Sequence, residues 1–382
     1  MATGEARGKR RTIYLNNAAS ARLSPEVQQA GIDHIHDLFL PDEKEGPMIR
    51  KHFAQLIGAN PSRIAIMPST AFAITLAATN LIRAESRGAI LLMEDQFNSA
   101  VFPWQSMCHK SNGKVRLHIV QRPEATSETW TDRILKALAD VPDILVVCLP
   151  PLHWSDGSLV DLNRISDTCS SQKIPFIVDA TQALGAMPLK GSVSMQHVSL
   201  LACSVHKWLR SPPGTCLVYI HPSLQETWRP LDAHGRGRLH HPDKTTSQGY
   251  PEEFFPDARK FDSGGKPNPI LLPMIRTALD SVTQLSMEDV QFKLRNVCQP
   301  LLNWASKDDR VTLPLEHGYH LIGVKPTGEN ATPERMEEVR KRLQESFGIV
   351  LAVRCGSFRV APYLDNTEDD MVCLVEAFTQ LL

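Results

Sequence analysis

The stretch 174–220 constrains the fold most strongly, because it contains three apolar runs that are followed by polar residues. The first run ends at Asp179, and the second is followed by Ser204 and Lys207. The third run begins just after a Ser-Pro-Pro-Gly turn, so Lys207 lies on a short connection between two predicted strands. Ligands of open α/β sheets bind at the carboxyl ends of the strands. The sequence therefore predicts a carboxylate and an amine at one ligand site.

Pyridoxal phosphate (PLP) catalysis uses such a pair, because a lysine holds the cofactor as a Schiff base and an acid pairs with the pyridine nitrogen. In this interpretation Asp179 keeps the ring nitrogen protonated, and Lys207 binds the aldehyde and then moves the proton at Cα. The alternative is structural. Asp179 and Gln182 have the spacing of a helix capping box, and Lys207 is then a solvated side chain.

The motifs DATQALG and SVHKW resemble the cofactor-lysine region of class V aminotransferases. This branch of the fold type I PLP enzymes includes cysteine desulfurases, selenocysteine lyases and isopenicillin-N epimerase-like proteins. The resemblance implies that Lys207 forms the Schiff base, Asp179 pairs with the pyridine nitrogen and Gln182 donates to the ring hydroxyl. It also implies that Ser204 and His206 contact the cofactor phosphate.

The resemblance implies an α/β fold of type I. The expected large domain has a mixed, mostly parallel seven-stranded sheet between helices, and the expected C-terminal domain is smaller and α+β. We predict an N-terminal arm at 1–15, a large PLP-binding domain at 16–262 and a small domain at 263–382. A chain of 382 residues is long enough for two domains.

Two further stretches match the family's cofactor site. Ser69 and Thr70 follow a strand-like run and begin a predicted helix, where N–H groups and hydroxyls attract a phosphate dianion. Helix capping alone also explains these hydroxyls. Phe97 follows the next predicted strand, where the family has the aromatic ring that stacks on the cofactor. The alternative for Phe97 is a position in the core.

Three later segments correspond less closely to the family. Trp154 stands where cysteine desulfurases have an Asn, and with His153 it either shapes the substrate pocket or packs on the core. Gly265 stands where desulfurases have the Thr that reaches the neighbouring subunit's phosphate, so only a backbone contact carries over. Arg236 and Arg238 either bind a second substrate anion or are solvated.

The end of the chain carries a candidate substrate site. Arg359 lies in SFRVAPYLDNTEDD, which resembles the closing motif of the family, and the resemblance implies that its forked guanidinium binds the substrate α-carboxylate. Asn17 lies in an opening stretch that borders the active site in the family, so it is a candidate substrate contact; the alternative is a strand followed by a helix cap. PLP together with Arg359 implies an α-amino acid substrate.

Composition excludes several partners. The 41 basic and 42 acidic side chains nearly cancel, which argues against nucleic-acid binding, and no apolar run approaches the ~18 residues of a membrane span. No apolar segment follows the basic start, so we expect no secretory signal. The eight cysteines lack a CxxC pair and are typical of thiols in a reducing compartment, so we expect a cytoplasmic protein without a metal site. The family resemblance implies a homodimer with the active site at the subunit interface.

The positions of the cysteines narrow the choice of reaction. Cysteine desulfurases carry a cysteine on a mobile loop well before the carboxylate-binding Arg, whereas this chain has none within 303–353. Cys355 lies only four residues before Arg359, and we expect it on the same strand as Arg359. Direct β-elimination through a Lys207 Schiff base and a quinonoid needs no such thiol. Our hypothesis is therefore a C–S or C–Se lyase of a cysteine derivative. The alternatives are an epimerase, an aminotransferase or another Cα or Cβ reaction in secondary metabolism, and a catalytically silent binding protein.

Overall fold

The chain folds into two compact units. The larger unit contains residues 18–154 and 158–289, and the smaller unit contains residues 11–17, 155–157 and 290–382. The computed structural model describes residues 11–35, 44–123, 128–239, 250–265 and 268–382. Residues 1–10 of the predicted N-terminal arm lie outside the described residues.

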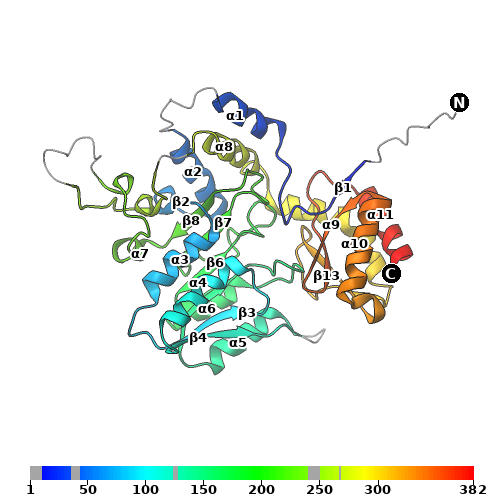
Figure 1. Ribbon diagram of the computed structural model, residues 1–382, viewed down its shortest axis with the longest axis horizontal. Coiled ribbons are helices and arrows are strands. Elements are labelled where there is room, and N and C mark those ends of the chain that lie inside the picture. The colour runs from blue at the N-terminus through cyan, green and yellow to red at the C-terminus, as the bar shows by residue number, and fades with distance from the viewer. Residues whose placement is uncertain (1–10, 36–43, 124–127, 240–249, 266–267) are drawn as a thin grey trace. The chain divides into compact units, whose positions relative to one another are not determined.

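The larger unit is built on a seven-stranded mixed sheet with the order β2-β8-β7-β6-β5-β3-β4 (Figure 1). Its strands are β2 (Ile64–Met67), β3 (Gly88–Met93), β4 (Val115–Val120), β5 (Ile144–Leu149), β6 (Phe176–Asp179), β7 (Leu200–Ser204) and β8 (Cys216–Ile220). Within this sheet β8 runs antiparallel to both of its neighbours, and the other six strands point in one direction. The predicted mixed, mostly parallel seven-stranded sheet is therefore confirmed.

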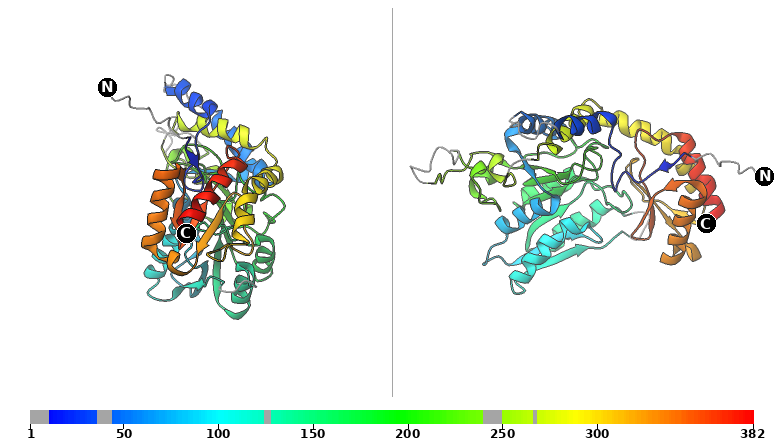
Figure 2. Two further views of the ribbon diagram at one scale, coloured as in Figure 1. Left: turned by 90° about the vertical axis from the view of Figure 1, so that its right-hand side faces the viewer. Right: turned by 45° about the horizontal axis from the view of Figure 1, so that its top comes forward.

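Helices cover both faces of this sheet (Figures 1 and 2). They are α1 (Pro25–Ile35), α2 (Glu45–Ile57), α3 (Thr70–Leu81), α4 (Phe102–Lys110), α5 (Trp130–Asp140), α6 (Leu162–Ser171), α7 (Pro222–Thr227) and α8 (Leu271–Val282), with short 3-10 turns η1 (Pro61–Arg63), η2 (Asn98–Ala100), η3 (Gly235–Gly237) and η5 (Ala258–Phe261). One face packs against α2, α5, α6 and α8, and the other packs against α3 and α4.

The central strands β5, β6 and β7 are apolar up to the last residue of β6 and β7, because both of their faces are buried. In β7, Leu201 and Cys203 join the cluster under α2 and α8, whereas Leu200 and Ala202 join the cluster under α3. This alternation follows from the two-residue period of a strand. Hydrophobic burial therefore fixes the strands, and the polar residues that follow them lie at the sheet edge.

The smaller unit contains an antiparallel four-stranded sheet with the order β12-β13-β10-β9 and a parallel pair of β1 and β11. Its elements are β1 (Ile13–Tyr14), β9 (Val311–Thr312), β10 (Ile322–Pro326), β11 (Ile349–Val350), β12 (Ala352–Arg354), β13 (Ser357–Val360), α9 (Met287–Ala305), which starts in the larger unit, η6 (Gly328–Ala331), α10 (Pro333–Phe347) and α11 (Glu368–Leu381). A single hydrophobic cluster joins these strands to α9, α10 and α11. This is the α+β layout expected for the C-terminal domain.

The borders of the compact units differ from the predicted borders at 15/16 and 262/263. Helix α8 packs on α1 and α2 and buries Leu272, Ile275 and Leu279 in the core of the larger unit, which moves the border to 289/290. Strand β1 pairs with β11, so the segment up to residue 17 belongs to the smaller unit rather than forming a separate arm. Among the described helices none is long and apolar enough to cross a membrane.

Candidate active site

Five predicted site residues lie at one edge of the seven-stranded sheet. Thr70 follows β2, Phe97 follows β3, Trp154 follows β5, Asp179 ends β6 and Lys207 follows β7. These five strands point in the same direction, so their carboxyl ends meet at the same edge. This edge is where open α/β sheets bind ligands.

Asp179 and Lys207 are both buried, each with 8% of its surface exposed. Burial raises the pKa of Asp179, while hydrogen bonds from Thr181 and the charge of Lys207 act to lower it. The strands that carry them, β6 and β7, are hydrogen-bonded neighbours. The structure therefore brings the predicted acid and amine together, in an environment that favours pairing of the carboxylate with a cation.

The backbone around Lys207 is held by several contacts. The amide of Arg210 donates to the Lys207 carbonyl at 3.0 Å, and the amide of Ala21 donates to the His206 carbonyl at 3.1 Å. Gly185 ends the DATQALG motif at a φ of +93°, and a Cβ at this position would lie 2.3 Å from the Trp208 carbonyl oxygen. Only glycine permits this approach. The two motifs that predicted the site thus pack directly on each other.

Three hydroxyl groups gather beside Asp179. The Thr70 hydroxyl lies 2.9 Å from the Ser204 hydroxyl and 3.4 Å from that of Thr181. Thr181 also accepts the Ser204 amide at 3.1 Å and donates its own amide to the Asp179 carboxylate at 3.1 Å. The sequence analysis missed Thr181, although its place directly after an acidic strand end is a signal that could have identified it. The cluster lies at the amino end of α3, where a phosphate is favoured.

The Gln182 side chain connects two segments that border the site, at Ala18 and at Trp208. Its amide nitrogen donates to the Ala18 carbonyl at 3.0 Å, and its carbonyl oxygen accepts from the Trp208 indole at 2.9 Å. The predicted donation of Gln182 to a ring hydroxyl stays a prediction.

Phe97 lies beside Lys207, whose Nζ is 5.1 Å from the centroid of the ring. Trp154 meets Phe97 edge to face with the centroids 5.3 Å apart, and its indole donates to the Asp95 carbonyl at 2.6 Å. His153 is fully buried and stacks on Trp130, so it packs in the core. The side chains of Phe97 and Trp154 therefore lie together at the edge of the site, whereas the side chain of His153 lies in the core.

Arg359 and Asn17 belong to the smaller unit. Arg359 lies on β13 with 2% of its surface exposed, and its guanidinium donates to the Asn16 side chain at 3.4 Å. Burial and the nearby charge of Arg354 lower the pKa of Arg359 to about 10, so it remains cationic at neutral pH. The Asn17 side chain donates to the Ala361 carbonyl at 3.0 Å. The sequence analysis missed Asn16, which contacts Arg359, and the predicted substrate contact of Asn17 stays a prediction.

A family model for class V aminotransferases matches residues 13–368. The chain belongs to this family. The predicted family is confirmed, and with it the prediction of a PLP-dependent enzyme.

Two curated relatives illustrate the range of proteins to which this chain is similar. An uncharacterized aminotransferase, YcbU of Bacillus subtilis, is 23% identical over 322 residues, which cover 84% of this chain and 80% of the relative. Isopenicillin N epimerase of Streptomyces clavuligerus is 25% identical over 181 residues, covering 47% of this chain and 44% of the relative. This chain is thus similar, at low sequence identity, to an uncharacterized aminotransferase and to an epimerase.

Solved structures confirm the fold of this chain. The cystine C–S lyase C-DES, in complex with its reaction product cysteine persulfide, matches with a TM-score of 0.84 at 16% identity, covering 97% of this chain and 98% of that chain. An apo cysteine desulfurase from Thermococcus onnurineus gives a TM-score of 0.80 at 16% identity, with 97% and 94% covered. At these identities the likeness concerns the fold alone.

The remaining predicted site residues are less tightly connected to the hydroxyl cluster. Ser69 caps α3 by accepting the Phe72 amide at 3.2 Å. His206 is half-buried, and burial and the charge of Lys207 lower its pKa, so its ring is neutral at pH 7. Gly265 has a φ of +81° at the end of a described segment, and its predicted contact stays a prediction. Arg238 stacks on Phe254 at 3.8 Å, which favours a structural role over anion binding.

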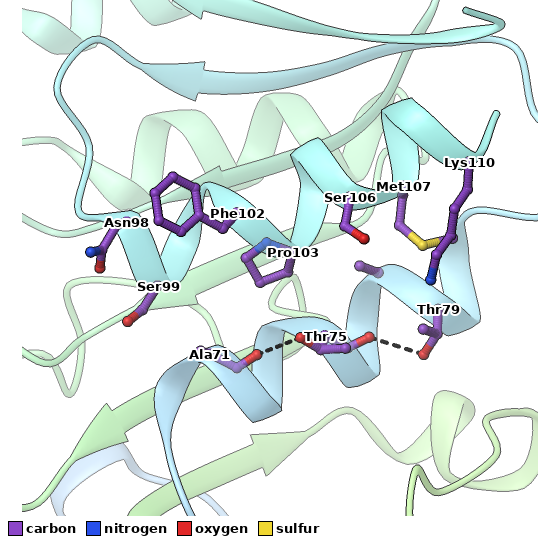
Figure 3. A pocket seen from close by; sticks show the side chains of 11 residues that line it. Ala71, Thr75, Thr79, Asn98, Ser99, Phe102, Pro103, Ser106, Met107 and Lys110 are labelled. Carbon is purple, nitrogen blue, oxygen red and sulfur yellow. Dashed lines mark hydrogen bonds between the residues drawn. The ribbon is translucent and has the colours of Figure 1, made fainter. Parts of the chain in front are cut away.

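A groove of about 370 Å³ lies between α3 and α4, outside this cluster (Figure 3). Its described lining residues include none of the predicted site residues. They are Ala71, Thr75, Ala78, Thr79, Asn98, Ser99, Phe102, Pro103, Ser106, Met107 and Lys110.

Proposed function

We propose that this enzyme acts on an α-amino acid and catalyses β-elimination from a cysteine derivative, as a C–S or C–Se lyase. One observation carries the proposal: Asp179 ends β6, Lys207 follows the neighbouring parallel strand β7, both are buried, and the Phe97 ring lies beside the amine. A buried carboxyl whose pKa burial raises, close to a buried amine at a sheet edge, indicates catalysis rather than packing.

The residues present fit PLP. The hydroxyls of Thr70, Thr181 and Ser204 would hold the phosphate at the start of α3, and Phe97 would cover one face of the ring. Asp179 would pair with the protonated ring nitrogen, and this positive charge would keep the buried carboxyl ionised. When bound, PLP supplies an electron sink for the electron pair left when the Cα proton is removed.

The protein's own groups then have separate tasks. Lys207 would accept the Cα proton, because it is the amine held at the strand edge beside Phe97. A phenyl ring cannot carry a proton, so Phe97 would orient and shield the site. Arg359, which stays cationic, would bind the α-carboxylate through its forked guanidinium.

The position of Cys355 favours a lyase over a persulfide-forming desulfurase. The turn between β12 and β13 consists of Cys355 and Gly356, with φ values of 45° and 73°. Strand pairing on both sides fixes this two-residue hairpin, so it is not a loop that could carry a thiol to a distant sulfur. Residues 303–353, all described, contain no cysteine.

The proposed reaction removes the Cα proton, breaks the Cβ–S or Cβ–Se bond and releases the sulfur or selenium fragment, which takes up a proton. One water then converts the three-carbon remainder to pyruvate and ammonia, so that atoms balance without an oxidant. We expect the PLP-loaded enzyme to form pyruvate and the eliminated sulfur or selenium product in equal amounts from at least one substrate of a panel. The eliminated product is a persulfide from cystine, a thiol from an S-alkyl cysteine, a sulfenic acid from a cysteine sulfoxide and hydrogen selenide from selenocysteine. We expect Cys355→Ala to keep kcat/KM within about twofold, like the exposed control Cys373→Ala.

Other outcomes identify the alternatives. Absence of pyruvate with every substrate of this panel contradicts the lyase proposal. Exchange of the Cα hydrogen with solvent without pyruvate would favour an epimerase, which the relative in Streptomyces clavuligerus makes the second candidate. Release of a 2-oxo acid that retains the side chain would indicate transamination. A protein that stays colourless with PLP would indicate a silent binding protein.

We also propose that the enzyme is a homodimer with its active site at the subunit interface. The support is the resemblance of the segment FDSGGKPN to a family loop that reaches the neighbouring subunit's phosphate. Light scattering of the PLP-loaded protein is expected to give twice the mass of one chain. A monomeric mass in a fully active sample would contradict the proposal.

We further propose a cytoplasmic location. The support is that none of the eight cysteines, all within the described residues, forms a disulfide, and that six of them are buried or half-buried. Fractionation of the source cells tests this, and recovery from an oxidising compartment would contradict it.

A further inference from the structure

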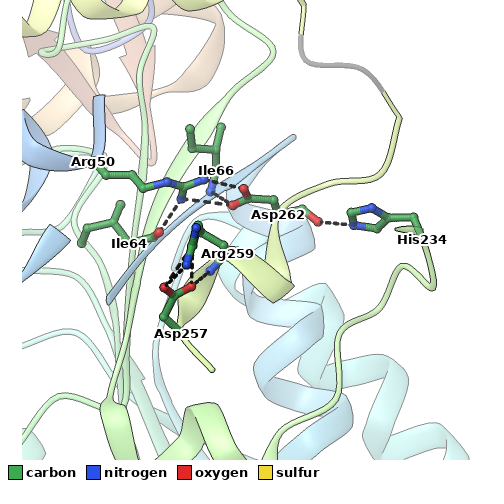
Figure 4. A network of polar contacts seen from close by, with 7 residues as sticks. All are labelled: Arg50, Ile64, Ile66, His234, Asp257, Arg259 and Asp262. Atoms are coloured by element: carbon green, nitrogen blue, oxygen red, sulfur yellow. Dashed lines mark hydrogen bonds and ion pairs between the residues drawn. The ribbon is translucent and has the colours of Figure 1, made fainter. Parts of the chain in front are cut away.

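The segment that contains Gly265 and the turn that contains Thr70 are both anchored at one ion pair, Arg50–Asp262 (Figure 4). Arg50 comes from α2, and Asp262 directly follows η5. One nitrogen of the Arg50 guanidinium donates to Asp262 Oδ1 at 3.1 Å, and the other nitrogen donates to Oδ2. This is the forked geometry that makes arginine–carboxylate pairs strong and directional.

The same pair closes the open edge of β2. The Ile66 amide donates to Asp262 Oδ1 at 2.8 Å, the Arg50 guanidinium donates to the Ile64 carbonyl, and the Ser263 amide donates to the Ile66 carbonyl at 3.1 Å. Strand β2 is the last strand of the sheet on this side, so these groups would otherwise be unpaired edge groups. The ion pair thus replaces a neighbouring strand.

One of the two segments that leave this anchor leads to the hydroxyl cluster of the site proposed above, and the other leads to Gly265, whose phosphate contact is a prediction from the family resemblance. Strand β2 ends at Met67, and the chain passes through Ser69 to the Thr70 hydroxyl. On the other side, Asp262 is followed by Gly264, whose amide donates to the Asp232 carboxylate at 2.9 Å, and then by Gly265. His234 also contacts the Asp262 carbonyl oxygen at 3.1 Å. Both segments therefore start from positions that the ion pair fixes.

We propose that Arg50 and Asp262 are positioning residues for phosphate recognition. They hold the Thr70 turn and the Gly265 segment so that both can present donors to a phosphate group. This inference rests on the proposed function. Because the pair is neutral in sum, it provides a scaffold and contributes little net field at the phosphate.

Asp262→Asn tests the proposal, because a pure charge effect and the loss of the ion pair would change the dissociation constant for PLP in opposite directions. Loss of a negative charge alone would strengthen binding of the phosphate dianion. Loss of the forked pair would release both segments, so we expect the dissociation constant for PLP to rise about tenfold. Pyridoxal lacks the phosphate, so its dissociation constant should change less than about twofold. We expect Arg50→Lys, which keeps the charge but not the fork, to behave in the same way.

The measurement is titration of each apo-protein with PLP and with pyridoxal, read by the absorbance of the lysine adduct. Asp143→Asn is the matched control, because Asp143 forms a similar fork with Arg116 on β4, at the opposite edge of the same sheet. We expect it to change neither constant. Unchanged or tighter PLP binding in Asp262→Asn, or equal weakening for both ligands, would overturn the inference while leaving the proposed function intact. A wild-type protein that forms no adduct would overturn both.

Discussion

Replacing Lys207 with alanine is expected to abolish the visible absorbance of the PLP-loaded protein and to lower kcat by at least about 10³-fold. The substitution removes both the amine that holds the cofactor and the base that moves the Cα proton. Lys207 is buried beside Phe97, with its charge acting on Asp179, so no exposed lysine can replace it without rearrangement. Spectra of the loaded protein and assays of pyruvate release provide the measurement.

Lys260→Met is the matched control for this experiment. Lys260 is also buried, its Nζ lies 4.8 Å from the Phe261 ring centroid, and it donates to the Gln225 carbonyl. Methionine keeps much of the apolar stem. We expect this variant to lose some stability but to retain the absorbance band. Persistence of the band in Lys207→Ala, with the protein folded, would show that another amine holds the cofactor.

Replacing Arg359 with lysine is expected to lower kcat/KM for the amino acid about 100-fold, while the dissociation constant for PLP stays within about twofold. A lysine keeps a positive charge but cannot form the two parallel hydrogen bonds that fix a carboxylate. The loss should appear in KM as well as in kcat, because the α-carboxylate would be bound less tightly and less precisely oriented.

Arg354→Lys is the control for the Arg359 variant. Arg354 lies on the neighbouring strand β12 but is exposed, and one of its nitrogens donates to the Val353 carbonyl at 2.7 Å. We expect it to change kcat/KM by less than about twofold. Equal losses in the two variants would indicate a general effect of charge in this part of the smaller unit. Unchanged kcat/KM in Arg359→Lys would contradict the assignment of Arg359.

The sequence predicted the elements that hydrophobic burial controls. The strand-like run before Ser69 is strand β2, because its residues are apolar and polar residues follow them. Thr70 begins α3 as predicted, because Ser69 supplies the cap. The motifs that contain Asp179 and Lys207 sufficed to predict the family. They carry the acid and the lysine that two adjacent strands present at their ends.

Tertiary structure decided which residues from distant segments meet. Thr70, Thr181 and Ser204 form one cluster although more than twenty residues separate each from the next, and Arg50 reaches Asp262 across most of the larger unit's sequence. Such contacts depend on strand order and register, which local patterns do not specify. For the same reason the unit borders differed from the predicted ones, because α8 and β1 are assigned by their packing partners.

By itself, then, the sequence determined which residues end the buried strands and what chemistry those residue types allow. The three-dimensional arrangement decided that Asn16 contacts Arg359, that His153 packs in the core, and that one ion pair closes the edge of β2. The physical reason is that the spacing of apolar residues along one segment is enough to show which of its residues will be buried. A hydrogen bond or an ion pair instead requires two segments to be held in a fixed register.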